Sequence, residues 1–207
     1  MTEWHSETIT PAAARVLDAL RETGVLEGAY LAGGTGLALH LGHRRSVDLD
    51  LVFTQPFDED AILQRLQGMT DLTIVARATQ TLHLTVHGVK VSFLGYSYPL
   101  LFPTADFHGT PIADPRDIAC MKITAIASRG TRRDFVDLYA ACKLVSLPEL
   151  LMLFDRKYAG TPYNRLHVLK SLTWFGDAEK DPMPHMLVPI EWSDVRRFFE
   201  REAPRLR

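Results

Sequence analysis

The stretch YLAGGTGLALHLGHRRSVDLDLVF, residues 30–53, decides the fold of this chain. It predicts a short strand, a glycine-rich turn, a short helix, a second turn and a second strand. Gly33 and Gly34 let the backbone turn sharply and come close to a ligand. Thr35 can cap a helix over residues 36–41, and the free N–H groups at such an end can hold a phosphate. We therefore expect a phosphate-binding turn here.

Two carboxylates follow in the second predicted strand, VDLDLVF. Asp48 and Asp50 are two residues apart, so they share one face of the strand, and Val47 and the neighbouring leucines point the other way. Two like charges this close repel, and Mg²⁺, which takes one or two carboxylates plus substrate phosphates, would relieve the repulsion. The alternative is that ion pairs with Arg44 or Arg45 hold the two aspartates. A magnesium site beside a phosphate turn indicates nucleotide chemistry.

The composition limits which classes of protein this chain can belong to. The chain has 207 residues, 46% of them hydrophobic and 23% charged, with a net charge of −2. These values are ordinary for a globular protein and give no global signal for nucleic acid or membrane. Cys120 and Cys142 have no metal-site spacing, so a reducing cytoplasm fits. The N-terminus has no signal-peptide pattern, and no apolar run is long enough to span a membrane.

The first half of the chain alternates helical and strand signals. Thr10 can cap a helix over residues 11–22, and an acidic first turn opens another helix over residues 58–67. Strand patterns that suggest an antiparallel run cover residues 72–78, 81–87 and 89–94, and a short extended piece covers residues 110–113. Residues 99–103 and 107–111 read as irregular.

The second half reads as mostly helical. Asp114 caps a helix that Gly130 interrupts and that resumes over residues 131–145. Further helices are predicted over residues 148–158, 163–175 and 192–202. We therefore expect an α/β core over residues 1–113 and a helical region packed on it over residues 114–207.

A third group of charged residues lies in KITAIASRGTRRDFVDLY, residues 122–139. Lys122 and Arg129 are two helical turns apart on one face, and Asp134 and Asp137 are neighbours three residues apart. Lys122 can neutralise a triphosphate, and Asp137 can orient it or act as a base. The alternative is a solvated helical face with ordinary ion pairs. Together the basic residues predict a local patch: Lys122, Arg129, Arg132 and Arg133.

The histidines predict no metal site. His83 and His87 share a face of a predicted strand but are far apart for one metal ion. His40 and His43 lie near the phosphate turn, and we expect them at the surface.

The two motifs GGTGLALHLGHRRSVDLDLVF and KITAIASRGTRRDFVDLY together resemble the AbiEii/AbiGii-type nucleotidyltransferases, the toxins of bacterial abortive-infection toxin–antitoxin operons. The stretch LTWFGDAEKDPMPHMLVPIEWSDVRRFFE is also similar to short members, so the resemblance covers nearly the whole chain. It implies a polymerase-β-like nucleotidyltransferase core with a mixed sheet. It also implies transfer of a nucleoside monophosphate from a nucleoside triphosphate to an acceptor, which in related toxins is the 3′ end of tRNA.

The resemblance also implies roles for single residues. Asp48 and Asp50 would bind Mg²⁺, and Asp137, or Asp134 in its place, would match the acidic residue downstream of the family's lysine. The residues expected to hold the nucleotide are Gly33, Gly34, Thr35, Arg45, Lys122 and Arg129. Basic residues around Arg129 would hold an RNA acceptor, and a cognate antitoxin protein is an expected partner.

One departure from the fold's usual pattern stands in VKVSFLGY. Ser92 occupies the position where such enzymes commonly carry a third carboxylate, and serine is a poor metal ligand and a poor base. Two alternatives are then open: Asp137 supplies the missing carboxylate from the helical half, or a single metal ion suffices. The sequence thus predicts a Mg²⁺-dependent nucleotidyltransferase toxin. Its main alternative is a catalytically degenerate module that binds nucleotide or antitoxin, and a metal-dependent phosphatase or sugar transferase explains fewer of the motifs.

Overall fold

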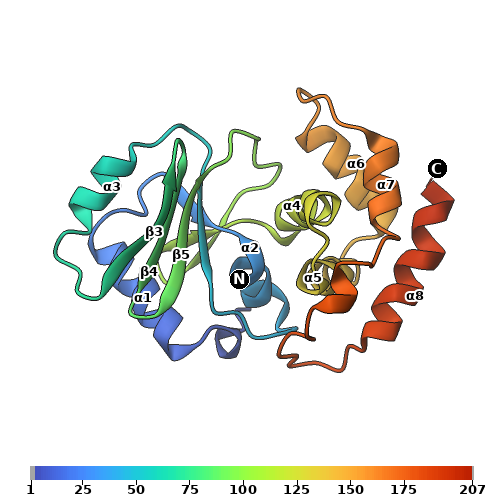
Figure 1. Cartoon of the computed structure of the whole chain (residues 1–207), viewed down its shortest axis with the longest axis horizontal. Coiled ribbons are helices and arrows are strands. Elements are labelled where there is room, and N and C mark those ends of the chain that lie inside the picture. The colour runs from blue at the N-terminus through green and yellow to red at the C-terminus, as the bar shows by residue number, and fades with distance from the viewer. Residues whose placement is uncertain (1–2, 207) are drawn as a thin grey trace.

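The computed structural model describes residues 3–206 as a mixed sheet with a helical half beside it (Figure 1). The strands are β1 (Ala29–Leu31), β2 (Leu49–Phe53), β3 (Leu72–Ala78), β4 (Thr81–Val86), β5 (Val89–Gly95), β6 (Ala105–Phe107) and β7 (Thr110–Ile112). The helices are α1 (Pro11–Glu22), α2 (Gly33–Leu41), α3 (Glu59–Arg65), α4 (Pro115–Ser128), α5 (Arg132–Ala141), α6 (Leu147–Lys157), α7 (Arg165–Ser171) and α8 (Trp192–Glu202). Among the described residues, no helix is long and apolar enough to cross a membrane.

The sheet has the strand order β3-β4-β5-β2-β1-β7-β6. β2 pairs with β5, and β1 with β7, in parallel, and the other neighbours are antiparallel. This confirms the mixed sheet and the antiparallel run from β3 to β5. The register places Asp50 opposite Ser92 on β5, and Ser92 opposite His83 on β4. Three polar side chains therefore lie in one row across three strands.

One face of the sheet is covered by α1 and α3. Along β4, Leu82, Leu84 and Val86 are buried in this core, while the residues between them are half-exposed. The α1 helix has the predicted bounds, and its Thr10 cap accepts a hydrogen bond from the Ala13 N–H at 3.2 Å. The buried side chains that alternate along the strands thus pack against the apolar face of α1 in one layer.

The helix after the glycine turn starts earlier than predicted. It begins at Gly33, so Thr35 lies in its first turn and is not its cap. The Thr35 hydroxyl instead contacts Ser46 Oγ at 2.8 Å and donates to the Asp48 carbonyl. Thr35 therefore ties α2 to the loop before β2, because its buried hydroxyl needs a partner there.

Helix signals in the second half were mostly correct. Asp114 caps α4, Gly130 ends it, and α5 follows. The helix predicted over residues 163–175 was too long, because the Asn164 side chain caps α7 by accepting from the His167 N–H at 3.0 Å, and the helix ends at Ser171. β6 begins between the two segments predicted as irregular, and it pairs with β7, which lies within the extended piece predicted over residues 110–113.

A buried ion pair fixes the loop between the sheet and α4. Lys157 Nζ donates to Asp117 at 2.6 Å and to the Pro99 carbonyl at 2.7 Å, and both side chains are fully buried. Asp117 also accepts from the backbone N–H groups of Leu101 and Phe102. The pair therefore joins α6, α4 and the loop in one place.

Replacing Lys157 with Met should lower the free energy of unfolding by about 3 kcal/mol, because it leaves the Asp117 carboxylate buried without its cation. Denaturant unfolding of the two proteins measures the difference. The double change Lys157→Met with Asp117→Leu should recover part of the loss, and equal stability of wild type and Lys157→Met would contradict the assignment.

Candidate active site

A polar cavity of about 110 Å³ lies where the first turn of α2, the start of β2 and the α4–α5 junction meet. Its lining residues are Gly34, Arg44, Ser46, Asp48, Asp50, Lys122, Arg129, Arg133 and Asp134. Small-molecule pockets typically measure about 300–1,000 Å³, so this cavity has the size for phosphate groups and not for a whole nucleotide. Residues separated by some hundred positions in sequence are brought together here, as predicted.

Asp48 and Asp50 both line the cavity, although Asp48 lies just before β2 and not inside the strand, and Val47 is half exposed to solvent. Burial raises the pKa of the Asp50 carboxyl, repulsion from Asp48 raises it further, and Lys122 acts against both. Gly33 has a φ of 61°, and a Cβ there would overlap the Asp50 carboxylate. Only glycine therefore lets the start of α2 approach this carboxylate so closely.

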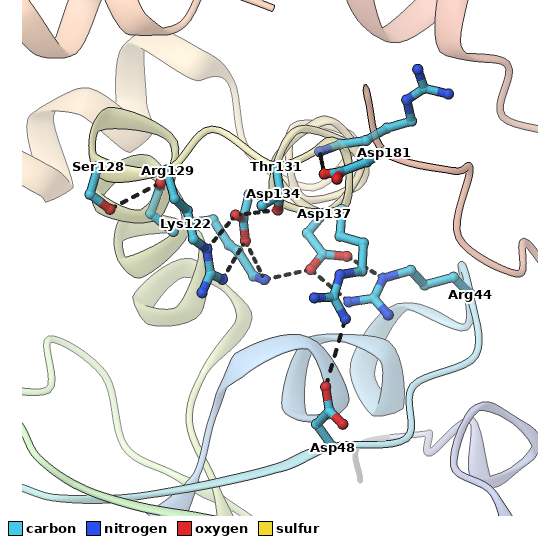
Figure 2. Close-up of polar contacts among 12 residues, drawn as sticks. Arg44, Asp48, Lys122, Ser128, Arg129, Thr131, Asp134, Asp137 and Asp181 are labelled. Atoms are coloured by element: carbon cyan, nitrogen blue, oxygen red, sulfur yellow. Dashed lines mark hydrogen bonds and ion pairs between the residues drawn. The ribbon is translucent and has the colours of Figure 1, made fainter. Parts of the chain in front are cut away.

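Lys122 is almost buried and touches two carboxylates. Its Nζ lies 3.1 Å from Asp134 Oδ1 and 2.7 Å from Asp137 Oδ2 (Figure 2). Burial alone would lower the pKa of Lys122, but these two carboxylates raise it. An ammonium group has three N–H donors, so two are used in these pairs and one remains for a ligand in the cavity.

Asp137 stands behind Lys122 and does not line the cavity. Arg44 binds its carboxylate in a fork, with Nε at 2.6 Å from Oδ1 and Nη2 at 2.8 Å from Oδ2, and His43 Nε2 donates to Oδ1 at 2.8 Å. Burial would raise the pKa of Asp137, but Lys122 and Arg44 hold it well below its usual range. His43 is buried, so its predicted surface position was wrong, and Arg44 binds Asp137 and not the pair Asp48 and Asp50.

Asp134 holds Arg129 over the cavity. Arg129 donates to the two carboxylate oxygens at 2.9 and 3.1 Å, and the Thr131 hydroxyl donates to Oδ2 at 2.6 Å. Burial acts to raise the pKa of Asp134, but Lys122 and Arg129 bring it down to about 2. Because Thr131 precedes α5 and Arg129 follows α4, Asp134 fixes the junction between the two helices.

The predicted basic patch is divided by the structure. Arg129 and Arg133 line the cavity, and Arg133 Nη1 lies 3.6 Å from Asp48 Oδ2. Arg132 points away, donating to the Ala178 carbonyl at 2.9 Å and lying over the Trp192 ring. Arg45 is exposed and outside the cavity lining, and its N–H donates to the His185 carbonyl at 2.8 Å. Neighbouring residues on a helix point about 100° apart, so Arg132 and Arg133 cannot share one site.

Ser46 was not predicted from sequence as part of the site, whereas Ser92 was expected at the position of a third carboxylate. Ser46 lines the cavity, and its place two residues before Asp48 was a signal that could have found it. Ser92 stands beside Asp50, where its hydrogen bond opposes the rise in the pKa of that carboxyl that burial causes, and its Oγ lies 3.0 Å from His83 Nδ1. The position of the missing third carboxylate is therefore filled by a serine and a histidine.

The carboxylates present fit a hard divalent cation. Asp48 and Asp50 offer oxygen ligands, and a cation between them would offset the burial and repulsion that destabilise the charged form of Asp50. Within residues 3–206 no cluster of three or more metal-ligating side chains exists, so phosphate oxygens would have to complete the coordination.

Comparisons with known proteins agree with this geometry. Residues 15–93, which contain α2, β2 and both aspartates, match the family described as the nucleotidyl transferase AbiEii toxin of a type IV toxin–antitoxin system. The chain belongs to the AbiEii nucleotidyltransferase toxin family. It is 35% identical over 194 residues to the uncharacterized protein aq_aa25 of Aquifex aeolicus, covering 90% of this chain and 92% of that protein. As a member of this family, the chain is a nucleotidyltransferase.

Solved structures share the fold of this AbiEii protein. MenT4, a nucleotidyltransferase toxin of Mycobacterium tuberculosis, is 15% identical with a TM-score of 0.57, covering 96% of this chain and 87% of its own. A putative nucleotidyltransferase of Helicobacter pylori is 15% identical with a TM-score of 0.51, covering 95% of both chains. The nucleotidyltransferase fold predicted from the sequence is thereby confirmed.

The buried Asp137 carboxylate should make stability depend on pH in the acid range. Because its pKa is lowered in the folded state, its contribution is present above the unfolded value near 4 and is lost as the pH falls below it. Asp137→Asn should lower the free energy of unfolding by about 3 kcal/mol at neutral pH and flatten its fall below pH about 4. Denaturant unfolding across pH measures both. An equally steep acid decline in the variant would contradict the assignment, and Asp18→Asn on the surface of α1 is the control.

The divided basic patch predicts different losses for neighbouring arginines. Arg133→Ala should weaken nucleoside triphosphate binding about tenfold, as expected for a lost charged hydrogen bond, with little change in thermal stability. Arg132→Ala should keep the affinity and lower the melting temperature, because it loses its contacts with Ala178 and Trp192. Calorimetry and thermal unfolding separate the two effects, and equal losses of affinity would contradict the division.

Proposed function

We propose that this AbiEii protein uses Mg²⁺ to transfer a nucleoside monophosphate from a nucleoside triphosphate to RNA, with the 3′ end of tRNA as the acceptor. The observation that carries the proposal is the meeting of Asp48 and Asp50 with Lys122, Arg129 and Arg133 in one cavity. Two carboxylates supply the metal ligands, and the surrounding cations offset the charge of a triphosphate.

The start of α2 supports a triphosphate site. Gly36 N–H donates to the Ala32 carbonyl at 2.9 Å, so the N–H groups of residues 33–35 lie ahead of the first helical hydrogen bond and point out of the helix end. A Cβ on Gly34 would overlap the Arg44 guanidinium, so glycine keeps backbone and cation together. Phosphate oxygens bound here would meet backbone N–H donors, the positive end of the helix and Arg44.

Each charged group then has a role. A Mg²⁺ ion bound by Asp48 and Asp50 would withdraw charge from the reacting phosphate and from the leaving pyrophosphate. Lys122 keeps one donor for a phosphate oxygen, while Asp134 and Asp137 hold its position. Asp137 acts as a positioning residue, because its carboxylate is fully buried and both oxygens are bonded to cationic donors.

An RNA acceptor is supported by the exposed cations at the cavity. The side chains of Arg129 and Arg133 are 60% and 54% exposed and belong to the junction of α4 and α5. They offer two sites for backbone phosphates, and such binding weakens as salt concentration rises. A cognate antitoxin that controls this activity is the second expected partner.

A non-catalytic role is the second candidate, and Ser92 is the observation that favours it. Beside Asp50, the fold's usual third carboxylate is replaced by the pair Ser92 and His83. A protein that binds nucleotide without transferring it would keep the cavity and lose only this group. Transfer of labelled nucleotide to RNA separates the two candidates.

Either Asp48→Asn or Asp50→Asn should lower transfer by roughly 100-fold or more, because metal coordination supplies several kcal/mol of transition-state stabilisation. The assay incubates the protein with Mg²⁺, total tRNA and each α-³²P-labelled nucleoside triphosphate in turn, and follows label in RNA. Label from one nucleotide identifies the donor.

The control is Asp18→Asn, an exposed acid on α1, which should transfer as the wild type does. Full activity of either metal-site variant would refute the proposed metal site. If wild type binds nucleotide but labels no RNA, the binding role gains support, and Ser92→Asp tests whether a third carboxylate restores transfer.

A further inference from the structure

A second cavity, of about 270 Å³, lies between the C-terminal end of α4 and the segment that contains α7. Its lining includes Arg129, Gly130, His167, Lys170, Trp174 and Asp177. It is more than twice as large as the cavity at Asp48 and Asp50, and its volume approaches that of small-molecule sites. None of its side chains except Arg129 has a role in the proposed chemistry.

Trp174 lines this cavity and is 68% exposed. Its neighbours Leu172 and Phe175 are buried in the helical core, so the turn after α7 sends Trp174 outward. Gly176 lies against the indole, and a Cβ there would come within 3.0 Å of the ring. The ring is thus held against the backbone of its own turn.

The other two tryptophans are placed differently. Trp4 Nε1 donates to the Asp106 carbonyl at 3.0 Å, and Trp192 Nε1 donates to Glu179 at 3.1 Å. In residues 3–206, Trp174 Nε1 has no such acceptor. The exposed indole therefore offers both its ring face and its N–H to a ligand.

The surroundings of Trp174 are cationic. Lys170 and the 60% exposed Arg129 side chain line the same cavity. His167 has a fixed ring, because its Nε2 donates to the Ala127 carbonyl at 3.0 Å. The acid in the cavity, Asp177, is paired with Lys180 at 3.0 Å. An aromatic platform beside cations is the arrangement that binds a nucleobase and its phosphate.

Arg129 connects this cavity to the candidate active site. It lines both cavities, and Asp134 holds its guanidinium (Figure 2). The two cavities therefore share a cation that can face a phosphate in the first and a ligand in the second. The first cavity is too small for a base, and the second offers the missing space.

We infer that Trp174 stacks on a nucleobase of a substrate, with Lys170 and Arg129 beside the adjoining phosphate or sugar. The inference rests on the proposed nucleotidyl transfer and adds the site for the base. The base belongs either to the donor nucleoside triphosphate or to the 3′ end of the acceptor RNA, and the chemistry of recognition is the same for both.

Binding measurements with the full chain test the inference. Calorimetry with each nucleoside triphosphate and Mg²⁺ measures the donor, and fluorescence anisotropy with a short labelled single-stranded RNA measures the acceptor. Trp174→Ala should weaken one of the two about tenfold or more, and Trp174→Phe should retain most of the affinity because it keeps an aromatic ring. Loss for the triphosphate alone assigns the donor base, and loss for the RNA alone assigns the acceptor base.

The matched control is Met152→Ala on α6, a side chain of similar exposure (62%) outside this cavity. It should bind both ligands as the wild type does. Unchanged binding of both ligands by Trp174→Ala would overturn the inference and leave a protein partner to explain the exposed ring. Equal losses in Trp174→Ala and Trp174→Phe would also overturn it.

The readout is binding, so it is separate from the test of transfer. If the wild type labels no RNA but Trp174 is needed for affinity, the proposed chemistry fails and the nucleobase site stands. If transfer depends on Asp48 and ligand affinity does not change in Trp174→Ala, the proposed chemistry stands and the nucleobase site fails.

Discussion

The fully buried carboxylate of Asp137 is the interaction on which the site depends. It receives Arg44 and His43 from the loop after α2 and Lys122 from α4, so three segments meet at one side chain of α5. A carboxylate removed from water costs several kcal/mol unless cations and hydrogen bonds surround it. These partners therefore fix the loop that leads into Asp48 against the helical half. The cavity exists because the two halves are joined by this charge cluster.

The same cluster prepares the cavity for anions. An aspartate holds each of three cations, Arg44, Lys122 and Arg129. Their side chains are therefore already ordered before a ligand binds. Groups ordered in advance stabilise developing charge without reorganisation, which is the larger part of electrostatic catalysis. The paired acids also reduce repulsion among the cations in the ligand-free protein. In the proposed nucleotidyl transfer, Asp134 and Asp137 would therefore act by holding other residues in place.

Local patterns in the sequence were sufficient for much of the fold. Thr10 and Asp114 cap helices where predicted, and the alternation along β4 and β5 gave an antiparallel hairpin. The role of Thr35 was wrong because its hydroxyl bonds to residues that only the folded chain brings near. Arg132 and Arg133 could not be distinguished either, since either face of α5 could have turned toward the cavity. The meeting of Asp48, Asp50 and Lys122 was predicted through family resemblance, and spacing alone left it open.

Two features of the site that the sequence did not predict come from the segments that follow α5 and pack beside the site. Backbone pairing of residues 43–45 with the segment at His185 and Leu187 closes one side of the charge cluster. On the other side, the turn after α7 brings Trp174 beside the end of α4. Since Arg129 lines both cavities, a change in how α7 packs on α4 would act on a cation of the candidate active site. Selection of the base and positioning of the phosphates would then be coupled through a single guanidinium held by Asp134.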